Sequence, residues 1–192
     1  SYFRDGRGLK DDDVVYVFPS DHIIEPISAC NSSLQRAVYA ARHSHIVTFG
    51  VPPTHPKEGY GYIVPGDALS GRGKVHALMI ERFVEKPSRD KAEELIKNGA
   101  FWNSGIFCFT CKTFEQEMTS HQPELSALYD AGYTGFLKKF GQVQSESIDY
   151  GIMQKTTRAA VVRFEPRWSD LGSWDSLMDF YSNGSHNLSV GK

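Results

Sequence analysis

Unbroken apolar runs alternate with amphipathic segments along this chain, and the two patterns predict different elements. Residues 14–18 are all apolar, which is typical of a strand buried on both faces of a sheet. Residues 27–42 space their apolar side chains as a helix does, and residues 45–51 return to a strand pattern. In residues 88–99 a Ser precedes a helical segment and a Gly follows it, which are start and stop signals for a helix.

The same two patterns continue toward the carboxyl end. Strands are expected at residues 61–66, which end in a turn, at 75–87, at 106–111 after a loop at 102–105, and at 158–165, with helices at 113–120, 123–131 and 147–155. Strands that alternate with helices predict an α/β domain with a largely parallel sheet. Ligands of such sheets bind beyond the carboxyl ends of the strands.

The composition excludes several classes of function but does not identify one. Lys and Arg number 21 and Asp and Glu 23, so the net charge of −2 gives no general attraction to nucleic acid or to an anionic membrane. No apolar run approaches the ~20 residues of a membrane span. The three Cys residues are odd in number and widely spaced, which argues against a disulfide framework and favours a reducing cytoplasm.

Two acidic residues are expected just beyond strand ends. Asp21 follows the first apolar run in "PSDH", and Asp170 follows a later strand in "WSDLGSW", before a turn at Gly172 and a helix cap at Ser173. Two carboxylates from different strands can meet at one Mg²⁺ ion, which takes oxygen ligands and usually few protein carboxylates. The alternative is that each acid belongs to a separate turn.

Three further motifs carry polar or backbone groups at strand ends. In "EGYGYI", residues 58–63, glycine lets the backbone approach a ligand closely. In "FVEKP", Lys86 is a compact positive charge for a phosphate, and Glu85 can accept hydrogen bonds from sugar hydroxyls. In "WNSG", Asn103 both donates and accepts. Each motif alone has a structural alternative: a strand that starts after a flexible loop for "EGYGYI", a surface turn before Pro for "FVEKP", and a turn before a strand for "WNSG".

The order of these motifs resembles the mannose-1-phosphate guanylyltransferase family, in the bacterial type often fused to a phosphomannose isomerase. The matching segments are "VFPSDHII", "TFGVPPTHPKEGYGYI", "RFVEKP", "WNSGIFCF", "SIDYGIMQKT" and "WSDLGSW". The resemblance implies a three-layer αβα, Rossmann-like nucleotide-diphospho-sugar transferase fold with a mixed, mainly parallel sheet. It also implies the reaction of GTP with α-D-mannose 1-phosphate to give GDP-mannose and pyrophosphate, in the cytoplasm and in a possible homodimer.

The resemblance assigns roles to individual residues. It implies that Asp21 and Asp170 hold Mg²⁺ against the phosphates and that Lys86 grips the sugar phosphate. The remaining substrate-binding positions that it implies are Tyr60, Gly61, Tyr62, Glu85, Asn103, Ser104 and Gly105. His22 is expected to fix its loop by hydrogen bonding rather than to act as a base, because an ionised phosphate nucleophile needs none.

Differences from the family pattern leave alternatives open. The family's Gly-rich amino-terminal loop, which cradles the triphosphate, is absent, so we expect residues 1–185 to be the carboxyl-terminal portion of the transferase domain and to be inactive alone. Residues 186–192 are expected to begin a small β region. Glu58 stands where Thr is usual and Gln154 where an acid is usual. A transferase of other base or sugar specificity, or a non-catalytic regulatory homologue, therefore remains possible.

Overall fold

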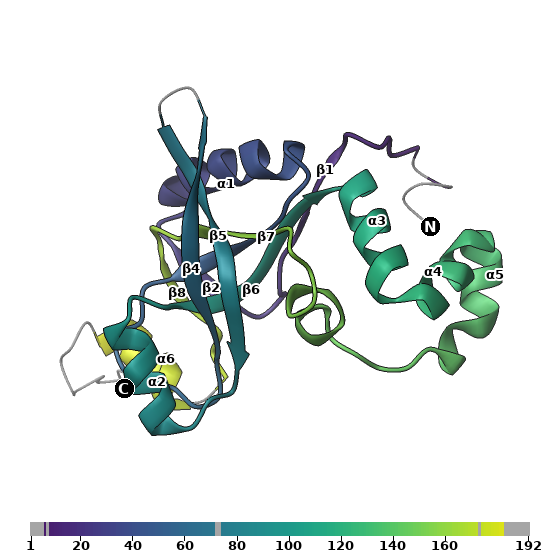
Figure 1. The fold of residues 1–192 in the computed structure, drawn as a ribbon. Helices are drawn as coiled ribbons and strands as arrows, with labels where there is room; N and C mark the ends of the chain where they lie inside the picture. Colours follow the sequence, from purple (N-terminus) through teal and green to yellow (C-terminus); the bar gives the residue numbers. More distant parts are fainter. Residues whose placement is uncertain (1–5, 7, 72–73, 173, 183–192) are drawn as a thin grey trace, which may run out of the picture.

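The structure is a computed structural model that describes residue 6 and residues 8–71, 74–172 and 174–182. The described strands are β1 (Val14–Val17), β2 (Ile23–Glu25), β3 (Ile46–Val51), β4 (Gly61–Gly71), β5 (Lys74–Glu85), β6 (Phe101–Thr110), β7 (Ala159–Arg163) and β8 (Arg167–Ser169). The described helices are α1 (Ile27–Arg42), α2 (Arg89–Lys97), α3 (Cys111–His121), α4 (Pro123–Asp130), α5 (Gly132–Lys139), η2 (Phe140–Gln142), η3 (Asp149–Met153) and α6 (Trp174–Ser182). Figure 1 shows α3, α4 and α5 grouped on one side of the strands, with α2 and α6 on the opposite side.

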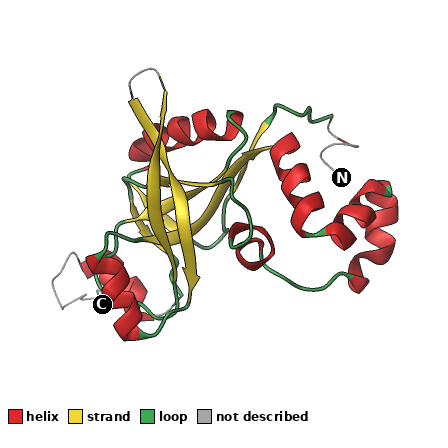
Figure 2. Ribbon diagram, in the orientation of Figure 1, coloured by secondary structure: helices red, strands yellow, loops and turns green. Residues whose placement is uncertain are grey.

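The central sheet is mixed, as the sequence predicted, but it is not mainly parallel. Its strand order is β1-β6-β3-β7-β5-β4, with a further pairing of β4 to β6. Among the described strands, β3 and β7 form the parallel pair and every other pair in this sheet is antiparallel. Alternation of strands and helices along the sequence does not fix strand direction, and the long β4–β5 pair, visible in Figure 2, has no helix between its strands.

Helices cover both faces of this sheet, which confirms the three-layer arrangement. On one face, Ala37, Ala40 and Ala41 of α1 are buried against a cluster that includes Val47 and Phe49 of β3. Small side chains at helical spacing let α1 lie close to the strands. On the other face, a second cluster joins the sheet to η3 and α3, through Ile46, Phe107, Phe109, Phe114, Ile152 and Met153.

One edge of β6 has a break that matters for the site. β1 pairs with the carboxyl half of β6 at residues 107–110, and β4 pairs with its beginning at residues 101–102. The other edge of β6 is paired to β3. Residues 103–106 therefore lie between the end of β1 and the start of β4, at a place where two strands leave the same edge.

Three predicted elements differ from the structure. β1 is an edge strand rather than a doubly buried one, and Val17 and Phe18 are 44% and 48% exposed because β1 has β6 as its described partner. The expected loop at residues 102–105 lies within β6, where Gly105 adopts φ +68°. The strand expected to stop at residue 66 continues to Gly71, because a register shift at Pro65 accommodates the missing N–H.

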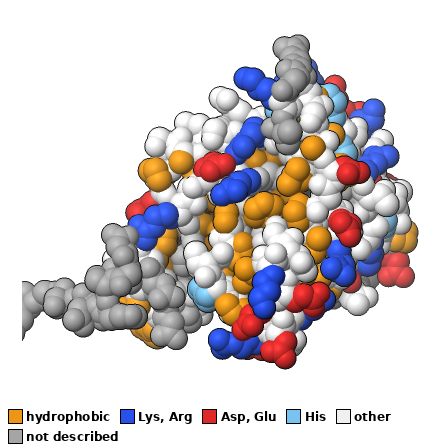
Figure 3. Space-filling model, turned by 60° about the vertical axis from the view of Figure 1, so that its left-hand side comes forward, with side chains coloured by type: hydrophobic (Ala, Val, Ile, Leu, Met, Phe, Trp, Pro, Cys, Tyr) orange, Lys and Arg blue, Asp and Glu red, His pale blue; other side chains and the backbone are white. Residues whose placement is uncertain are grey.

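The described surface is mixed in character. Figure 3 shows hydrophobic side chains exposed in the middle of one face, between Lys, Arg, Asp and Glu side chains. Within the described ranges, no helix is both long and apolar enough to cross a membrane. Cys30, Cys108 and Cys111 are buried free thiols, as expected. The helix cap predicted at Ser173 and the β region predicted at residues 186–192 lie outside the described residues.

Candidate active site

The short ribbon of β2 and β8 brings the two strand-end acids to one region. Ile23 of β2 lies opposite Ser169 of β8 in an antiparallel pair, so one further residue in this register sets His22 beside Asp170. The pKa of His22 is lowered by burial, and the charges of Asp21 and Asp170 act on the same imidazole in the opposite direction. Both carboxylates therefore lie within electrostatic reach of one side chain.

His22 fixes this loop through Trp168. The indole Nε1 of Trp168 donates a hydrogen bond to His22 Nδ1 at 3.1 Å, and the two rings meet edge to face. An accepting Nδ1 leaves the proton of a neutral imidazole on Nε2, which lies 4.0 Å from Asp21 Oδ1. The hydrogen bonding expected of His22 is therefore present in the structure.

Asp170 is held by a network that the sequence did not reveal. The hydroxyl of Tyr60 donates to Asp170 Oδ1 at 2.6 Å, and the N–H of Gly172 donates to the same oxygen at 3.2 Å. Lys57 Nζ donates in turn to the Tyr60 hydroxyl at 3.0 Å. The family resemblance places Tyr60 among the substrate-binding residues, and in the structure its hydroxyl is directed at this acid.

The donor set suits a metal that takes few protein ligands. In the part of the chain that the structure describes, no three His, Cys, Asp or Glu side chains gather as a metal cluster. Asp21 and Asp170 supply hard carboxylate oxygens, and the Asp21 side chain is 79% exposed. Such a pair fits Mg²⁺, which commonly completes its octahedron with water and substrate phosphate.

A second polar cluster begins where β4 and β5 meet. Gly61 lies opposite Glu85 in the antiparallel register. A Cβ on Gly61 would be 2.5 Å from Glu85 Oε2, so glycine at this position leaves room for the carboxylate against the backbone. Glycine is required here for close approach rather than for an unusual φ.

Gly61→Ala should displace the Glu85 carboxylate, which ends a flexible side chain, and should also press on the Phe83 ring, whose nearest atoms would lie 3.2 and 3.3 Å from the new Cβ. If Glu85 binds the sugar, loss of one charge-assisted hydrogen bond predicts an increase in KM for the sugar phosphate of roughly tenfold. Steady-state kinetics of the intact protein measure this. The matched control is Gly66→Ala on the same strand, where a Cβ would meet ordinary contacts of 3.5 Å or more and KM should be unchanged.

Asn103 joins this cluster from β6, together with Asp149, an acid to which the sequence motifs assigned no role. Asn103 Oδ1 accepts from the Thr48 hydroxyl at 2.8 Å, and its Nδ2 donates to Asp149 Oδ1 at 3.0 Å. Asp149 begins η3 and lies in the quoted motif "SIDYGIMQKT". The position of Asp149 within this family motif was the feature of the sequence that could have indicated a role in the site.

Burial raises the pKa of both acids in this cluster. Burial has the largest effect on Glu85, the charge of Asp149 adds to it, and Lys86 opposes both. Burial also raises the pKa of Asp149, against the hydrogen bond from Asn103. Glu85, Asn103 and Asp149 thus provide acceptors and a donor amide in a partly desolvated place, as polyhydroxyl recognition requires.

Asp149→Asn should stabilise the fold at neutral pH and lower activity roughly tenfold or more, because it removes a buried charge and a charged acceptor together. A raised folded-state pKa means that the native state binds more protons than the unfolded state. The free energy of unfolding of the native protein should therefore fall as the pH rises from the ordinary value of 3.8 through the raised pKa.

Urea unfolding from pH 3.5 to 7 measures this dependence, which Asp149→Asn should flatten. Asp67→Asn, an exposed acid on β4, is the control and should leave the pH profile unchanged. A steeper profile in Asp149→Asn than in the parent would contradict the assigned burial cost.

Two backbone conformations complete the arrangement. Lys86 adopts φ +47°, and its N–H donates to the Tyr60 carbonyl at 3.1 Å, which ties the end of β5 to the start of β4. A Cβ on Gly105 would be 3.7 Å from Pro19 Cγ and 3.9 Å from His22 Cε1. The "PSDH" loop therefore passes directly over Gly105, in the break along the edge of β6.

Two predicted substrate-binding side chains lie in the core instead. Tyr62 is fully buried, and its hydroxyl accepts from the N–H of Lys57 at 2.8 Å. Ser104 is 1% exposed, and its hydroxyl accepts from the N–H of Ile106. Successive residues of a strand face opposite sides of the sheet. Tyr62 follows Gly61 and Ser104 follows Asn103, so both side chains point to the face opposite the polar cluster.

The model of the family described as nucleotidyl transferase matches residues 6–185. This chain belongs to the nucleotidyl transferase family. The match covers the break in β6, both polar clusters and the ribbon that carries Asp170. The α/β class, the three-layer arrangement and the transferase class predicted from the sequence are confirmed, apart from the direction of the strands.

This nucleotidyl transferase is also similar to individual proteins of known name and structure. It is 41% identical to "Mannose-1-phosphate guanylyltransferase" of Sinorhizobium fredii, over 87% of this chain and 34% of that protein. It is 38% identical to "Xanthan biosynthesis protein XanB" of Xanthomonas campestris, over 88% of this chain and 37% of that protein. The solved structure described as mannose-1-phosphate geranyltransferase from Thermus thermophilus matches with a TM-score of 0.85 and 31% identity.

That match covers 98% of this chain and 56% of the Thermus chain. The nucleotidyl transferase chain thus spans little more than a third of the two curated relatives.

The two residues that depart from the family motifs have other partners for their side chains or face solvent, although the backbone N–H of Gln154 donates to the Asp149 carbonyl at 3.0 Å. Glu58 Oε1 accepts from the N–H of Arg89 at 3.2 Å, so this acid caps the beginning of α2. Gln154 is an exposed residue that ends η3. Neither side chain replaces a group of the candidate site.

Proposed function

We propose that the protein transfers GMP from GTP to α-D-mannose 1-phosphate, giving GDP-mannose and pyrophosphate. The observation that carries this proposal is the convergence of two polar clusters at the break along β6. One contains the acids Asp21 and Asp170. The other contains Glu85, Asn103 and Asp149. The name of the Sinorhizobium relative, a mannose-1-phosphate guanylyltransferase, supports the choice of base and sugar.

In this reaction, an oxygen of the sugar phosphate attacks the α-phosphorus of GTP while the bond to the β-phosphate oxygen breaks. The nucleophile is already ionised, so no side chain must remove a proton. The work of the protein is to position two anions and offset their repulsion. We assign Lys86 to the sugar phosphate as a point charge.

Asp21 and Asp170 would hold Mg²⁺, and the hydrogen bonds from Tyr60 and Gly172 to Oδ1 would orient Asp170 for it. A bound Mg²⁺ ion would neutralise phosphate oxygens during the transfer. Glu85 and Asn103 would bind mannose hydroxyls, with Asp149 orienting the Asn103 amide. The open backbone at Gly61 and Gly105 would let the sugar approach.

The surroundings of the reaction are part of the proposal. We place the protein in the cytoplasm, where GTP and a sugar phosphate meet and where buried free thiols stay reduced. We propose a homodimer, and we assign residues 1–185 to the carboxyl-terminal portion of the transferase domain.

Pyrophosphate release by the full-length protein tests the function. GTP, ATP, dTTP and UTP are each paired with mannose 1-phosphate or glucose 1-phosphate, with and without Mg²⁺. Release with GTP, mannose 1-phosphate and Mg²⁺ together is the expected result. Release with another pair would replace the proposed base or sugar, and no release from a folded protein would favour a regulatory homologue.

A further inference from the structure

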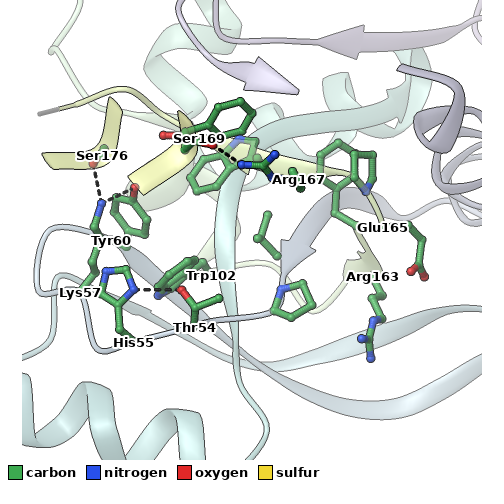
Figure 4. Close-up of a pocket in the computed structure, with 16 residues that line it drawn as sticks. Thr54, His55, Lys57, Tyr60, Trp102, Arg163, Glu165, Arg167, Ser169 and Ser176 are labelled. Carbon is green, nitrogen blue, oxygen red and sulfur yellow. Dashed lines mark hydrogen bonds between the residues drawn. The ribbon is translucent and has the colours of Figure 1, made fainter. Parts of the chain in front are cut away.

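A pocket of about 360 Å³ lies on the opposite side of β6 from the Asn103 cluster. We call it the Trp102 pocket, and Figure 4 shows the side chains that line it. Trp102 lines this pocket, whereas the adjacent Asn103 bonds to Asp149 on the other face. The aromatic residues of its wall are Tyr60, Trp102, Phe164, Trp168 and Phe180. A pocket of this size and character is typical of a small-molecule site.

The charge of the Trp102 pocket is unbalanced. Lys57, Arg163 and Arg167 line it, against the acid Glu165. Glu165 is paired with Arg36 at 3.4 Å. Among the side chains that the structure describes, none of the three lining cations forms an ion pair with a carboxylate. The described side chains that line the pocket thus carry more positive than negative charge, which favours an anionic ligand.

One buried donor in the wall is also unsatisfied. Trp102 is only 6% exposed. Its indole Nε1 is buried and has no hydrogen-bond partner among the described residues. Leaving a buried N–H unpaired is unfavourable. Because this nitrogen is buried, the indole contributes to the wall of the pocket through its apolar surface.

Lys57 marks the end of the pocket where an anion would bind. Its Nζ donates to the hydroxyls of Tyr60 at 3.0 Å and Ser176 at 2.7 Å, which are both neutral. Figure 4 shows these three side chains together at one end, with Arg163 and Glu165 at the other. An anionic group near Lys57 would gain a charge-assisted partner, while its apolar body packed beside Trp102.

We propose that the Trp102 pocket is a second ligand site for a small planar organic anion, whose charged group binds Lys57 and whose apolar body packs against the aromatic wall. The site has a direct connection to Asp170, because Lys57 donates to the Tyr60 hydroxyl that donates to this acid. The consequence for Asp170 rests on the proposed function, whereas ligand binding does not.

Phenyl phosphate is a suitable probe, and isothermal titration calorimetry on the full-length protein measures its binding without any need for activity. We expect a Kd on the order of 1 mM or tighter, from the binding that a ligand of this size can achieve. Inorganic phosphate and phenol, which each lack one half of the probe, should bind at least tenfold more weakly.

Variants then locate the site. Lys57→Met should weaken phenyl phosphate binding about tenfold or more, and Lys57→Arg should retain binding because the charge is kept. Arg163→Met, at the other end of the pocket, should change the Kd by no more than about threefold. Lys86→Ala should leave the Kd unchanged, because that residue belongs to the proposed sugar-phosphate site.

Equal affinity for phenyl phosphate and inorganic phosphate would overturn the proposal. So would loss of binding in Lys86→Ala with retention in a folded Lys57→Met. If pyrophosphate release fails for every substrate pair but phenyl phosphate binding depends on Lys57, the second site stands without the proposed reaction.

Discussion

Asp170→Asn lowers pyrophosphate release from GTP and mannose 1-phosphate by roughly 10²–10³-fold in the full-length protein, if this acid holds the metal as proposed. The amide oxygen can still accept the hydrogen bonds from Tyr60 and Gly172, so the loop should keep its conformation. The change therefore removes the charge and little else. We expect the free energy of unfolding to change by about 1 kcal/mol or less.

Initial rates at saturating substrates, with Mg²⁺ varied, measure this loss. The metal concentration needed for half-maximal rate should rise along with the fall in rate. Asp67→Asn is the matched control, because Asp67 is an exposed acid on β4. Near-normal turnover in Asp170→Asn would remove the metal assignment and leave Tyr60 bonded to a structural acid.

Lys86→Ala raises the KM for mannose 1-phosphate by roughly 10–100-fold and changes the KM for GTP far less, since a hydrogen bond to a charged group contributes about 1.5–3 kcal/mol. Lys86 follows directly on Glu85 at the end of β5, and its N–H is bonded to the Tyr60 carbonyl. That backbone bond does not depend on the side chain, so the end of β5 should stay in place.

The comparison that decides this assignment is between the two substrates. Lys91→Ala, which removes a lysine paired with Glu94 on α2, should alter neither KM. Equal losses for GTP and mannose 1-phosphate in Lys86→Ala would contradict a specific role at the sugar phosphate. Lys86→Arg should recover only part of the affinity, because a planar fork does not reproduce a point charge.

Both polar clusters on which these two predictions rest are assembled by the fold from distant parts of the chain. Both lie where β1 and β4 leave the same edge of β6, and each is completed by residues distant in the sequence. Asp149 reaches Asn103 from 46 positions away, and Tyr60 reaches Asp170 from 110 positions away. A site assembled in this way depends on the sheet as a whole.

The sequence by itself determined the local elements and the chemistry. Helix α1 occupies the predicted residues 27–42, and Ser88 caps α2 by accepting from the N–H of Lys91. These features follow from spacing and capping within a few residues, which a linear pattern contains. The sequence also contains the strand-end acids and the "FVEKP" and "WNSG" motifs. Their order along the chain indicated the transferase family.

Only the tertiary structure decided pairing and burial. The apolar run of β1 has the composition of a central strand, but its exposure depends on which strands lie beside it. Tyr60 and Tyr62 are equivalent in the sequence, yet one hydroxyl bonds to Asp170 and the other accepts from the backbone of Lys57. The physical reason is that strand direction, register and facing side are properties of contacts between distant segments.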